Sequence, residues 1–198
     1  MKLPVMEQFY TVQGEGKFTG QAAYFIRLAG CDVGCVWCDV KDSWDAVGYP
    51  TFTPEELALE VSKHGCNIVV ITGGEPAMYD LTELTTAIKA TGKRVHIETS
   101  GAHPIRGNFD WITYSPKKFK APLPESAAIA DELKVIVFNQ SDFDWAASHQ
   151  KTVPEKCLLY LQPEWSKREE MHDKIVSFVL ANPEWHIGLQ THKYLGVD

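Results

Sequence analysis

Short apolar segments alternate with helix-forming segments along most of this chain, and this alternation restricts its fold more than any other feature. Strand patterns, rich in β-branched and aromatic residues, cover residues 22–29, 67–72, 94–98, 111–114, 133–138, 158–161 and 185–189. Helix patterns lie between most of them, at residues 53–65, 80–92, 126–132, 142–149 and 167–180. This order predicts an α/β fold with a mainly parallel sheet.

The length of the chain decides how such a sheet can close. A complete eight-stranded βα barrel usually needs ~250 residues, whereas this chain has 198. We therefore expect a shortened, partly open βα barrel that forms one domain over residues 1–198.

The composition argues against several classes of protein. Hydrophobic residues make up 44% and charged residues 23% of the chain, as in ordinary globular proteins. Apolar runs stay well short of the roughly 20 residues of a membrane span, and residues 1–7 lack the apolar core of a signal peptide. The net charge of −7 argues against nucleic-acid binding, which needs a basic surface. We expect a cytoplasmic protein with neither membrane nor nucleic acid as a partner.

Unusual polar residues follow five of the strand patterns. They are Thr72 to Glu75, Glu98 to Gly101, Ser115 to Lys117, Gln162 with Pro163, and Gln190. The carboxyl ends of parallel strands lie along one edge of a sheet, and active sites of α/β proteins form at that edge. The sequence therefore predicts a single polar mouth.

Three of the five cysteines, Cys31, Cys35 and Cys38, fall within eight residues directly after a strand pattern. Thiolates with the spacing C-x3-C-x2-C can hold three corners of a four-iron, four-sulfur cluster and leave the fourth iron open to a small molecule. A structural zinc site fits less well because it generally needs a fourth ligand nearby. A redox pair of Cys35 and Cys38 would leave Cys31 unexplained.

The other cysteines and most histidines are expected to be structural. Cys66 and Cys157 lie in apolar contexts and predict small core residues. His96 alternates into the core of its strand, whereas His149 is expected on an exposed helix face. For His192, near the end of the chain, a role in the site and a structural role are equally supported.

The cysteine loop and a second motif together resemble the radical S-adenosylmethionine (SAM) superfamily. The second motif, Gly73-Gly74-Glu75-Pro76, lies one βα unit after the cysteine loop and is similar to the GGEP element that contacts the methionine amino group of SAM. The resemblance implies a [4Fe-4S] cluster on Cys31, Cys35 and Cys38, with SAM on the open iron. It also implies an external electron donor such as flavodoxin or ferredoxin.

Further stretches resemble one family of that superfamily, the 7-carboxy-7-deazaguanine synthases. They are Phe9 to Gly16, Arg27, Trp37-Cys38-Asp39, Ser115-Pro116-Lys117 and Gln190-Thr191-His192-Lys193. The similarity extends from residue 5 to the end of the chain and implies a reduced, partly open βα barrel and a homodimer. It also implies a substrate, 6-carboxy-5,6,7,8-tetrahydropterin, and a product, 7-carboxy-7-deazaguanine, formed with loss of ammonia in the branch that leads to queuosine.

The resemblance divides the predicted site into a substrate side and a cofactor side. By position, the pterin would contact Val12, Gln13, Gly14, Arg27 and Thr72, joined by Glu15, Gln190 and His192. SAM would contact Trp37, Cys38, Asp39, Gly74, Ser115, Pro116 and Lys117, joined by Glu75, Ser100 and Gln162. The side chains suit these roles, because Arg27 can form paired charge-assisted bonds to the pterin carboxylate. Gln13 and Glu15 offer acceptors to its guanidine-like edge.

The implied reaction is carried by the cofactor rather than by side-chain acids. Reductive cleavage of SAM gives a 5′-deoxyadenosyl radical, which takes the hydrogen from C6 of the pterin. The ring contracts, and a hydrogen atom returns to regenerate SAM. The protein must keep water and other hydrogen donors away, and we expect the chain termini to roof the pocket, with Gln190 and His192 nearby.

One position departs from the family pattern. The family usually carries Thr or Ser two residues after the third cysteine, where the hydroxyl ligates magnesium beside the substrate carboxylate. Here that residue is Val40, which offers no oxygen. Magnesium prefers six oxygens and readily keeps waters, so Mg2+ could still bind through water or with help from Asp39 or Asp42. We expect a weakened or missing magnesium site.

Two other functions share some of these features. A radical-SAM activase of a glycyl-radical enzyme has the same cysteine spacing, but it needs a groove for a protein chain. An electron-transfer iron–sulfur module would not be an enzyme, and it normally ligates every iron of its cluster. SAM binding separates the module from both enzymes.

Overall fold

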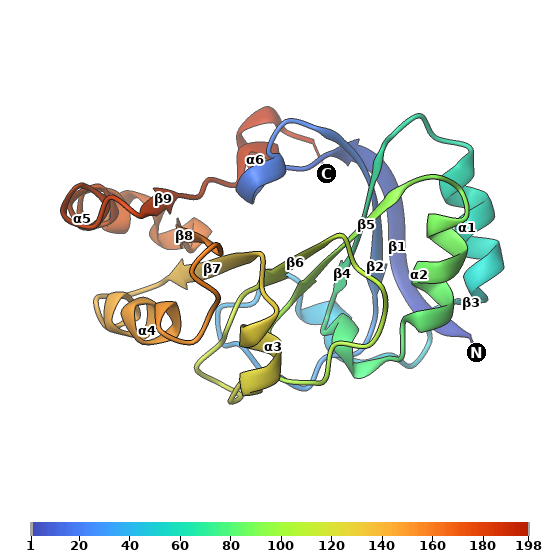
Figure 1. The fold of residues 1–198 in the computed structure, drawn as a ribbon, viewed down its shortest axis with the longest axis horizontal. Helices are drawn as coiled ribbons and strands as arrows, with labels where there is room; N and C mark the ends of the chain where they lie inside the picture. Colours follow the sequence, from blue (N-terminus) through green and yellow to red (C-terminus); the bar gives the residue numbers. More distant parts are fainter. Residues whose placement is uncertain (1, 198) are drawn as a thin grey trace.

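The computed structural model describes residues 2–197 and contains one nine-stranded sheet with the strand order β3-β1-β2-β4-β5-β6-β7-β8-β9. Its strands are β1 (Leu3–Val12), β2 (Ala22–Leu28), β3 (Thr51–Phe52), β4 (Ile68–Gly73), β5 (Arg94–Thr99), β6 (Trp111–Tyr114), β7 (Glu132–Val137), β8 (Leu158–Pro163) and β9 (Trp185–Ile187). From β2 to β9 all neighbours are parallel, and β1 runs antiparallel to β2 and β3. The described sheet curves without closing (Figure 1), which confirms the predicted fold class.

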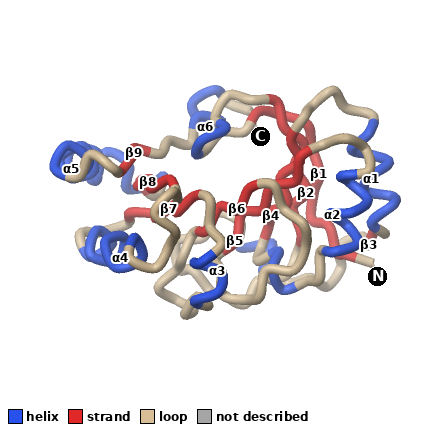
Figure 2. The backbone as a smooth tube through the Cα atoms, in the orientation of Figure 1, coloured by secondary structure: helices blue, strands red, loops and turns tan. Residues whose placement is uncertain are grey.

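Five helices lie along the outer side of the curved sheet (Figures 1 and 2). They are α1 (Pro54–Ser62), α2 (Thr82–Lys89), α3 (Pro124–Ala128), α4 (Ser141–Gln150) and α5 (Arg168–Ala181). A sixth, α6 (Thr191–Leu195), lies on the inner side, and short 3-10 turns occur at η1 (Gly16–Phe18), η2 (Lys41–Trp44), η3 (Pro76–Met78) and η4 (Trp165–Lys167). None of the helices between residues 2 and 197 has the length and apolar character needed to span a bilayer.

Two apolar cores lie between the sheet and the outer helices. The first joins α1 and α2 to β2, β4 and β5 and includes Leu57, Ile71 and Leu84. The second joins α4 and α5 to β7, β8 and β9 and includes Leu161 and Trp185. As predicted, the two remaining cysteines are buried in these cores, Cys66 in the first and Cys157 in the second. The outer helices thereby fix the strands and leave the inner face of the sheet for the site.

The inner face is plugged at the amino ends of the strands by the turn η1. Its residue Phe18 packs against Ala23, Ile68 and Val70 near the starts of β2 and β4. Because alternate residues of a strand face the same side, Glu132 and Lys134 of β7 share a face. The opposite, carboxyl end of the strands is where the polar segments predicted from the sequence gather.

The structure corrects three expectations. The strands β1 and β3 were not predicted, because Pro4 and Glu7 interrupt the apolar pattern of β1 and because β3 is only the pair Thr51–Phe52. The predicted helix over residues 126–132 is the shorter α3, and β7 already begins at Glu132. His149 is buried rather than exposed. Its ring faces β6, where its Nδ1 lies 3.0 Å from the Tyr114 hydroxyl.

Candidate functional site

A cavity of about 280 Å³ opens at the carboxyl ends of the strands. Thr72 near the end of β4, Ser115 after β6 and Gln162 in β8 line it together, as the predicted polar mouth requires. All of the predicted site residues except Pro116 line the cavity, and the Pro116 carbonyl instead accepts a hydrogen bond from Trp145 Nε1 at 3.3 Å. The structure therefore gathers segments from the two ends and the middle of the chain around one space.

The cysteine loop follows β2 and forms one wall of this cavity. Cys31, Cys35 and Cys38 carry free thiols and line the cavity. Gly34, with a φ of 74°, lets the loop reverse between the first two cysteines. Burial raises the pKa of the Cys31 thiol, and burial raises that of Cys35 to about 11. Metal binding would replace the protons of these thiols, since thiolates are the ligands.

The donor set suits a cluster better than a single ion. Among residues 2–197, no three His, Cys, Asp or Glu side chains converge in a way that could hold one metal ion. The three thiolates of an iron–sulfur cluster bind three different irons and need not converge on one point. Three free thiols on one loop, packed beside Val33 and Ala102 in one wall of the cavity, fit this requirement.

The glycine motif is packed directly against the cysteine loop. Gly74 N donates to Leu28 O at 2.9 Å, and Glu75 N donates to Gly30 O at 2.8 Å. A Cβ at position 74 would lie 2.3 Å from Gly30 O, so only glycine allows the two loops to approach this closely. The backbone of Gly74 can therefore form part of the cavity wall.

The carboxylate of Glu75 ties two segments together, the η3 turn and the end of β5. It is 1% exposed and accepts hydrogen bonds from Ala77 N at 3.0 Å and from Ser100 N at 2.8 Å. The hydroxyls of Thr99 and Ser100 donate to the same carboxylate. Both oxygens of Glu75 thus have protein donors, and the side chain holds the glycine motif against the end of β5.

Two further groups on the cofactor side are available to a ligand. Lys117 lines the cavity with its ammonium nitrogen 5.5 Å from the centre of the Trp37 ring, and burial, aided by nearby Lys134, lowers its pKa to about 8. Gln162 is 1% exposed, and its Oε1 finds no hydrogen-bond partner among residues 2–197. An unpartnered buried acceptor in the cavity wall can bind a donor of the ligand.

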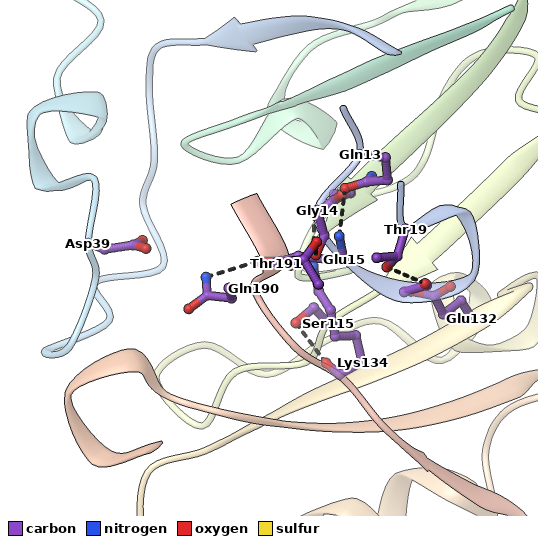
Figure 3. A network of polar contacts seen from close by, with 12 residues as sticks. Gln13, Gly14, Glu15, Thr19, Asp39, Ser115, Glu132, Lys134, Gln190 and Thr191 are labelled. Atoms are coloured by element: carbon purple, nitrogen blue, oxygen red, sulfur yellow. Dashed lines mark hydrogen bonds and ion pairs between the residues drawn. The ribbon is translucent and has the colours of Figure 1, made fainter. Parts of the chain in front are cut away.

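The substrate side is a network of ion pairs and hydrogen bonds (Figure 3). Lys134 forms ion pairs with Glu98, at 2.9 Å, and with Glu15. Gln13 Nε2 donates to Glu98 at 3.0 Å, and Gln190 Nε2 donates to Glu15 at 2.9 Å. Burial alone would raise the pKa of Glu15, but Lys134 and Gln190 lower it to about 2. The network therefore keeps a buried carboxylate ionised.

The C-terminal segment covers the cavity and contacts both of its sides. Thr191 N and Oγ1 both donate to Gly14 O at 2.9 Å (Figure 3), while Lys193 forms an ion pair with Asp39 at 2.9 Å. A Cβ at Gly14 would lie 2.1 Å from His192 Nδ1, so glycine makes room for that ring. His192 lines the cavity, and burial lowers its pKa.

Arg27 lies in β2 at the edge of the substrate side. Glu7 of β1 is its register partner, and its Nε forms an ion pair with Glu7 at 2.6 Å. Thr72 of β4 is its register partner on the other side, and both residues line the cavity. The ion pair with Glu7, which the sequence did not predict, orients the guanidinium.

The sequence reasoning missed the group at the centre of the network. Lys134 is buried, yet it was not singled out because it sits inside the apolar strand pattern at residues 133–138. Its presence there was a usable signal, since a charge in a buried parallel strand needs partners. Glu98 was recognised only as the end of a strand and was given no role. The partners of Lys134 and of Glu98 come from segments far away in sequence.

Comparison with known proteins adds independent findings. The family model described as the radical SAM superfamily matches residues 25–117. The chain is 52% identical to the 7-carboxy-7-deazaguanine synthase of Flavobacterium psychrophilum, over 98% of this chain and 92% of that protein. It is 47% identical to the synthase of Synechocystis, over 98% and 93%. The crystal structure of QueE from Escherichia coli superimposes with a TM-score of 0.88 at 31% identity, covering 96% of this chain and 94% of that one.

Proposed function

The chain belongs to the 7-carboxy-7-deazaguanine synthase family of radical SAM enzymes, and from this premise we propose that it contracts the ring of 6-carboxy-5,6,7,8-tetrahydropterin. The product is 7-carboxy-7-deazaguanine, an intermediate on the way to queuosine, and ammonia is lost. The observation that carries this proposal is a single cavity that joins three free thiols to a ring of buried polar groups.

The cofactor side is proposed to hold the cluster and SAM. Cys31, Cys35 and Cys38 ligate three irons of the [4Fe-4S] cluster, which together with SAM supplies a carbon radical able to take a hydrogen atom from the substrate. The Gly74 backbone faces the methionine part of SAM. The other contacts are those predicted from the sequence, at Trp37, Asp39, Ser100, Ser115, Pro116, Lys117 and Gln162. Glu75 acts there as a positioning residue because its carboxylate already binds protein donors.

The substrate side is proposed to hold the pterin. Arg27 pairs with its carboxylate, and Gln13 and Glu15 bind the guanidine-like edge. Glu15 remains an ionised acceptor because Lys134 lowers its pKa, and Glu98 forms an ion pair with the same lysine. The remaining contacts are at Val12, Gly14, Thr72, Gln190 and His192, which line the same side of the cavity. The C-terminal segment keeps water away from the radical.

The arrangement favours this function over the two alternatives. The C-terminal segment bonds across the mouth, to Gly14 through Thr191 and to Asp39 through Lys193, where an activase would need a groove for a protein chain. An electron-transfer module would have no use for the Lys134 network beside its cluster. The names of the relatives point in the same direction.

Four finer points belong to the proposal. Magnesium binds weakly at most, because Val40 offers no side-chain oxygen and Asp39 is already paired with Lys193. The electron donor is flavodoxin or ferredoxin. The protein works in the cytoplasm, and it does so as a homodimer, as the family resemblance implies.

The test is a reaction with a defined product. The protein is reconstituted anaerobically with iron and sulfide and incubated with SAM, a reductant and the carboxypterin. Mass spectrometry should detect 7-carboxy-7-deazaguanine, and an enzymatic assay should detect ammonia. SAM cleavage without the deazaguanine would contradict the proposed substrate, whereas absence of SAM cleavage would contradict the cofactor assignment.

A further inference from the structure

A second and much smaller cavity lies behind the substrate side. Its volume is about 10 Å³, and it shares three wall residues, Gln13, Glu15 and Glu98, with the main cavity. Its other walls come from the sheet and the η1 turn and are Phe18, Val70, His96, Trp111, Thr113 and Glu132. A polar cavity of this size holds about one water molecule.

Two buried polar atoms in these walls lack protein partners. His96 is 3% exposed, and its Nε2 finds no hydrogen-bond partner among residues 2–197. The same holds for Trp111 Nε1, although Trp111 is near enough to the Glu132 carboxyl to offset part of the rise in pKa that burial causes there. An unsatisfied buried donor or acceptor is destabilising, so two of them beside one cavity indicate a missing polar ligand.

The chemistry of the walls selects the ligand. The Trp111 indole N–H can only donate, whereas the carboxylates can accept, so the ligand must both accept and donate. Burial lowers the pKa of His96 to about 4, so its ring is neutral at physiological pH and does not repel a donor. Water meets these requirements. An ammonium ion does not, because it has no lone pair to accept a hydrogen bond from the Trp111 N–H.

The same walls support the segment that carries the substrate loop. Phe18 packs its ring on His96, at 4.6 Å between centroids, and on Trp111, at 5.0 Å. Lys17 N donates to the Glu132 carboxylate at 3.0 Å. The η1 turn thus rests on the residues around the small cavity, and residues 13–15 lead directly into it.

We propose that the small cavity holds one ordered water molecule, bound by His96 Nε2 and Trp111 Nε1, which positions Glu98 and the loop of residues 13–15 for the substrate. His96 and Trp111 act as positioning residues and do not touch the substrate themselves. The water completes the hydrogen bonding beneath the loop, so that its polar groups are held before the ligand arrives. The identity of the substrate as a pterin rests on the proposed function.

A crystal structure of the wild-type protein at atomic resolution tests the water itself. One ordered water should appear at about 3 Å from both His96 Nε2 and Trp111 Nε1. An empty cavity, or protein partners for both nitrogens, would overturn the proposal whatever the substrate is.

A matched pair of variants at His96 tests the positioning role. Gln keeps a polar group near the place of Nε2, whereas Met has a similar length without a hydrogen-bonding tip. The reconstituted protein, loaded with SAM and without reductant, is titrated with the carboxypterin by calorimetry. His96→Met should weaken pterin binding about tenfold, as expected for one lost buried hydrogen bond. His96→Gln should stay within about threefold of wild type, and SAM affinity should be unchanged in both.

Two outcomes of the titration would refute the positioning role. Equal weakening by Gln and Met would assign His96 to packing alone, and wild-type affinity in the Met variant would show that the water has no effect. If the wild-type protein itself fails to bind the pterin, the proposed function is wrong. The crystallographic water then decides whether the cavity is a water site.

Discussion

The two sides of the cavity are built in different ways. On the substrate side, Lys134, Glu15, Glu98, Gln13 and Gln190 bind one another through ion pairs and hydrogen bonds. On the cofactor side, the cysteine loop presents three free thiols packed among apolar neighbours. The residues of the substrate side hold one another in place through their own charges. The thiols of the cofactor side are ligands that an iron–sulfur cluster would hold together.

This difference predicts how each side responds to its ligand. A network with its charges already paired is arranged before substrate binds, so little ordering remains to be done. The thiols of Cys31 and Cys35 are protonated in the metal-free protein, since burial raises the pKa of both. The cysteine loop therefore gains its final order when metal replaces those protons.

The largest effect is expected from loss of a cluster ligand. Cys31→Ala, Cys35→Ala and Cys38→Ala should each abolish SAM cleavage, measured as 5′-deoxyadenosine by liquid chromatography. Cys66→Ala and Cys157→Ala are the controls and should retain it, because these cysteines lie in the apolar cores. Cleavage by any loop variant with an intact four-iron cluster would refute the assignment of ligands.

Lys134→Met should have the largest effect on stability. Removing one partner of a buried ion pair leaves unpaired charges on Glu15 and Glu98, which costs about 3–5 kcal/mol. Urea unfolding of the metal-free protein should show this loss, and Cys35→Ala should show much less. Adding Glu15→Gln and Glu98→Gln to Lys134→Met should restore most of the stability. Equal losses for Lys134→Met and Cys35→Ala would remove the contrast between the two sides.

Acid should weaken the substrate side in a defined pH window. The pKa of Glu15 is about 2 in the folded protein against an ordinary value of 4.5. A lowered pKa contributes stability that is complete above 4.5 and is lost as the pH falls through 2, roughly 3 kcal/mol in total. The difference in unfolding free energy between wild type and Glu15→Gln should therefore shrink between pH 5 and pH 2. A pH-independent difference would mean that Glu15 is not held ionised by Lys134.

Arg27→Ala should affect the two ligands unequally. Loss of a charged hydrogen bond to the substrate carboxylate should weaken pterin binding by about tenfold. SAM affinity, measured by calorimetry on the reconstituted protein, should change little. Equal weakening of both ligands would place Arg27 in the scaffold, with its ion pair to Glu7 as its main role.

The smallest effect concerns magnesium. Activity should depend only modestly on added Mg2+, because Val40 lines the cavity without an oxygen ligand. Val40→Thr supplies a hydroxyl and should increase that dependence in steady-state assays. Complete loss of wild-type activity on chelation, with recovery only by Mg2+, would show that the ion is firmly held.

The contrast between the sides also explains what the sequence could predict. The cofactor side consists of short contiguous motifs, Cys31 to Cys38 and Gly73 to Pro76, so it could be predicted from local sequence patterns. The parallel strands could be predicted equally well because each carries its own apolar run. The strand β1 was missed because Pro4 and Glu7 interrupt its apolar pattern. The ion pair of Glu7 with Arg27 was missed with it, because that pair depends on the register of β1 against β2.

The polar network of the substrate side could be predicted only in part. Gln13, Glu15 and Gln190 were reached through a family resemblance, but the residue that joins them was not. Lys134 is separated from Glu15 by 119 positions and from Glu98 by 36. No local pattern states which buried carboxylate a buried lysine will meet, because the pairing depends on how the sheet curves.

The most direct test of the contrast is to titrate the metal-free protein and the reconstituted protein with each ligand separately. We expect the carboxypterin to bind the metal-free protein with an affinity within about tenfold of that of the reconstituted protein, because the substrate side is arranged in advance. SAM should bind measurably only after the cluster has been installed. Pterin binding that requires the cluster, or SAM binding that does not, would contradict this account.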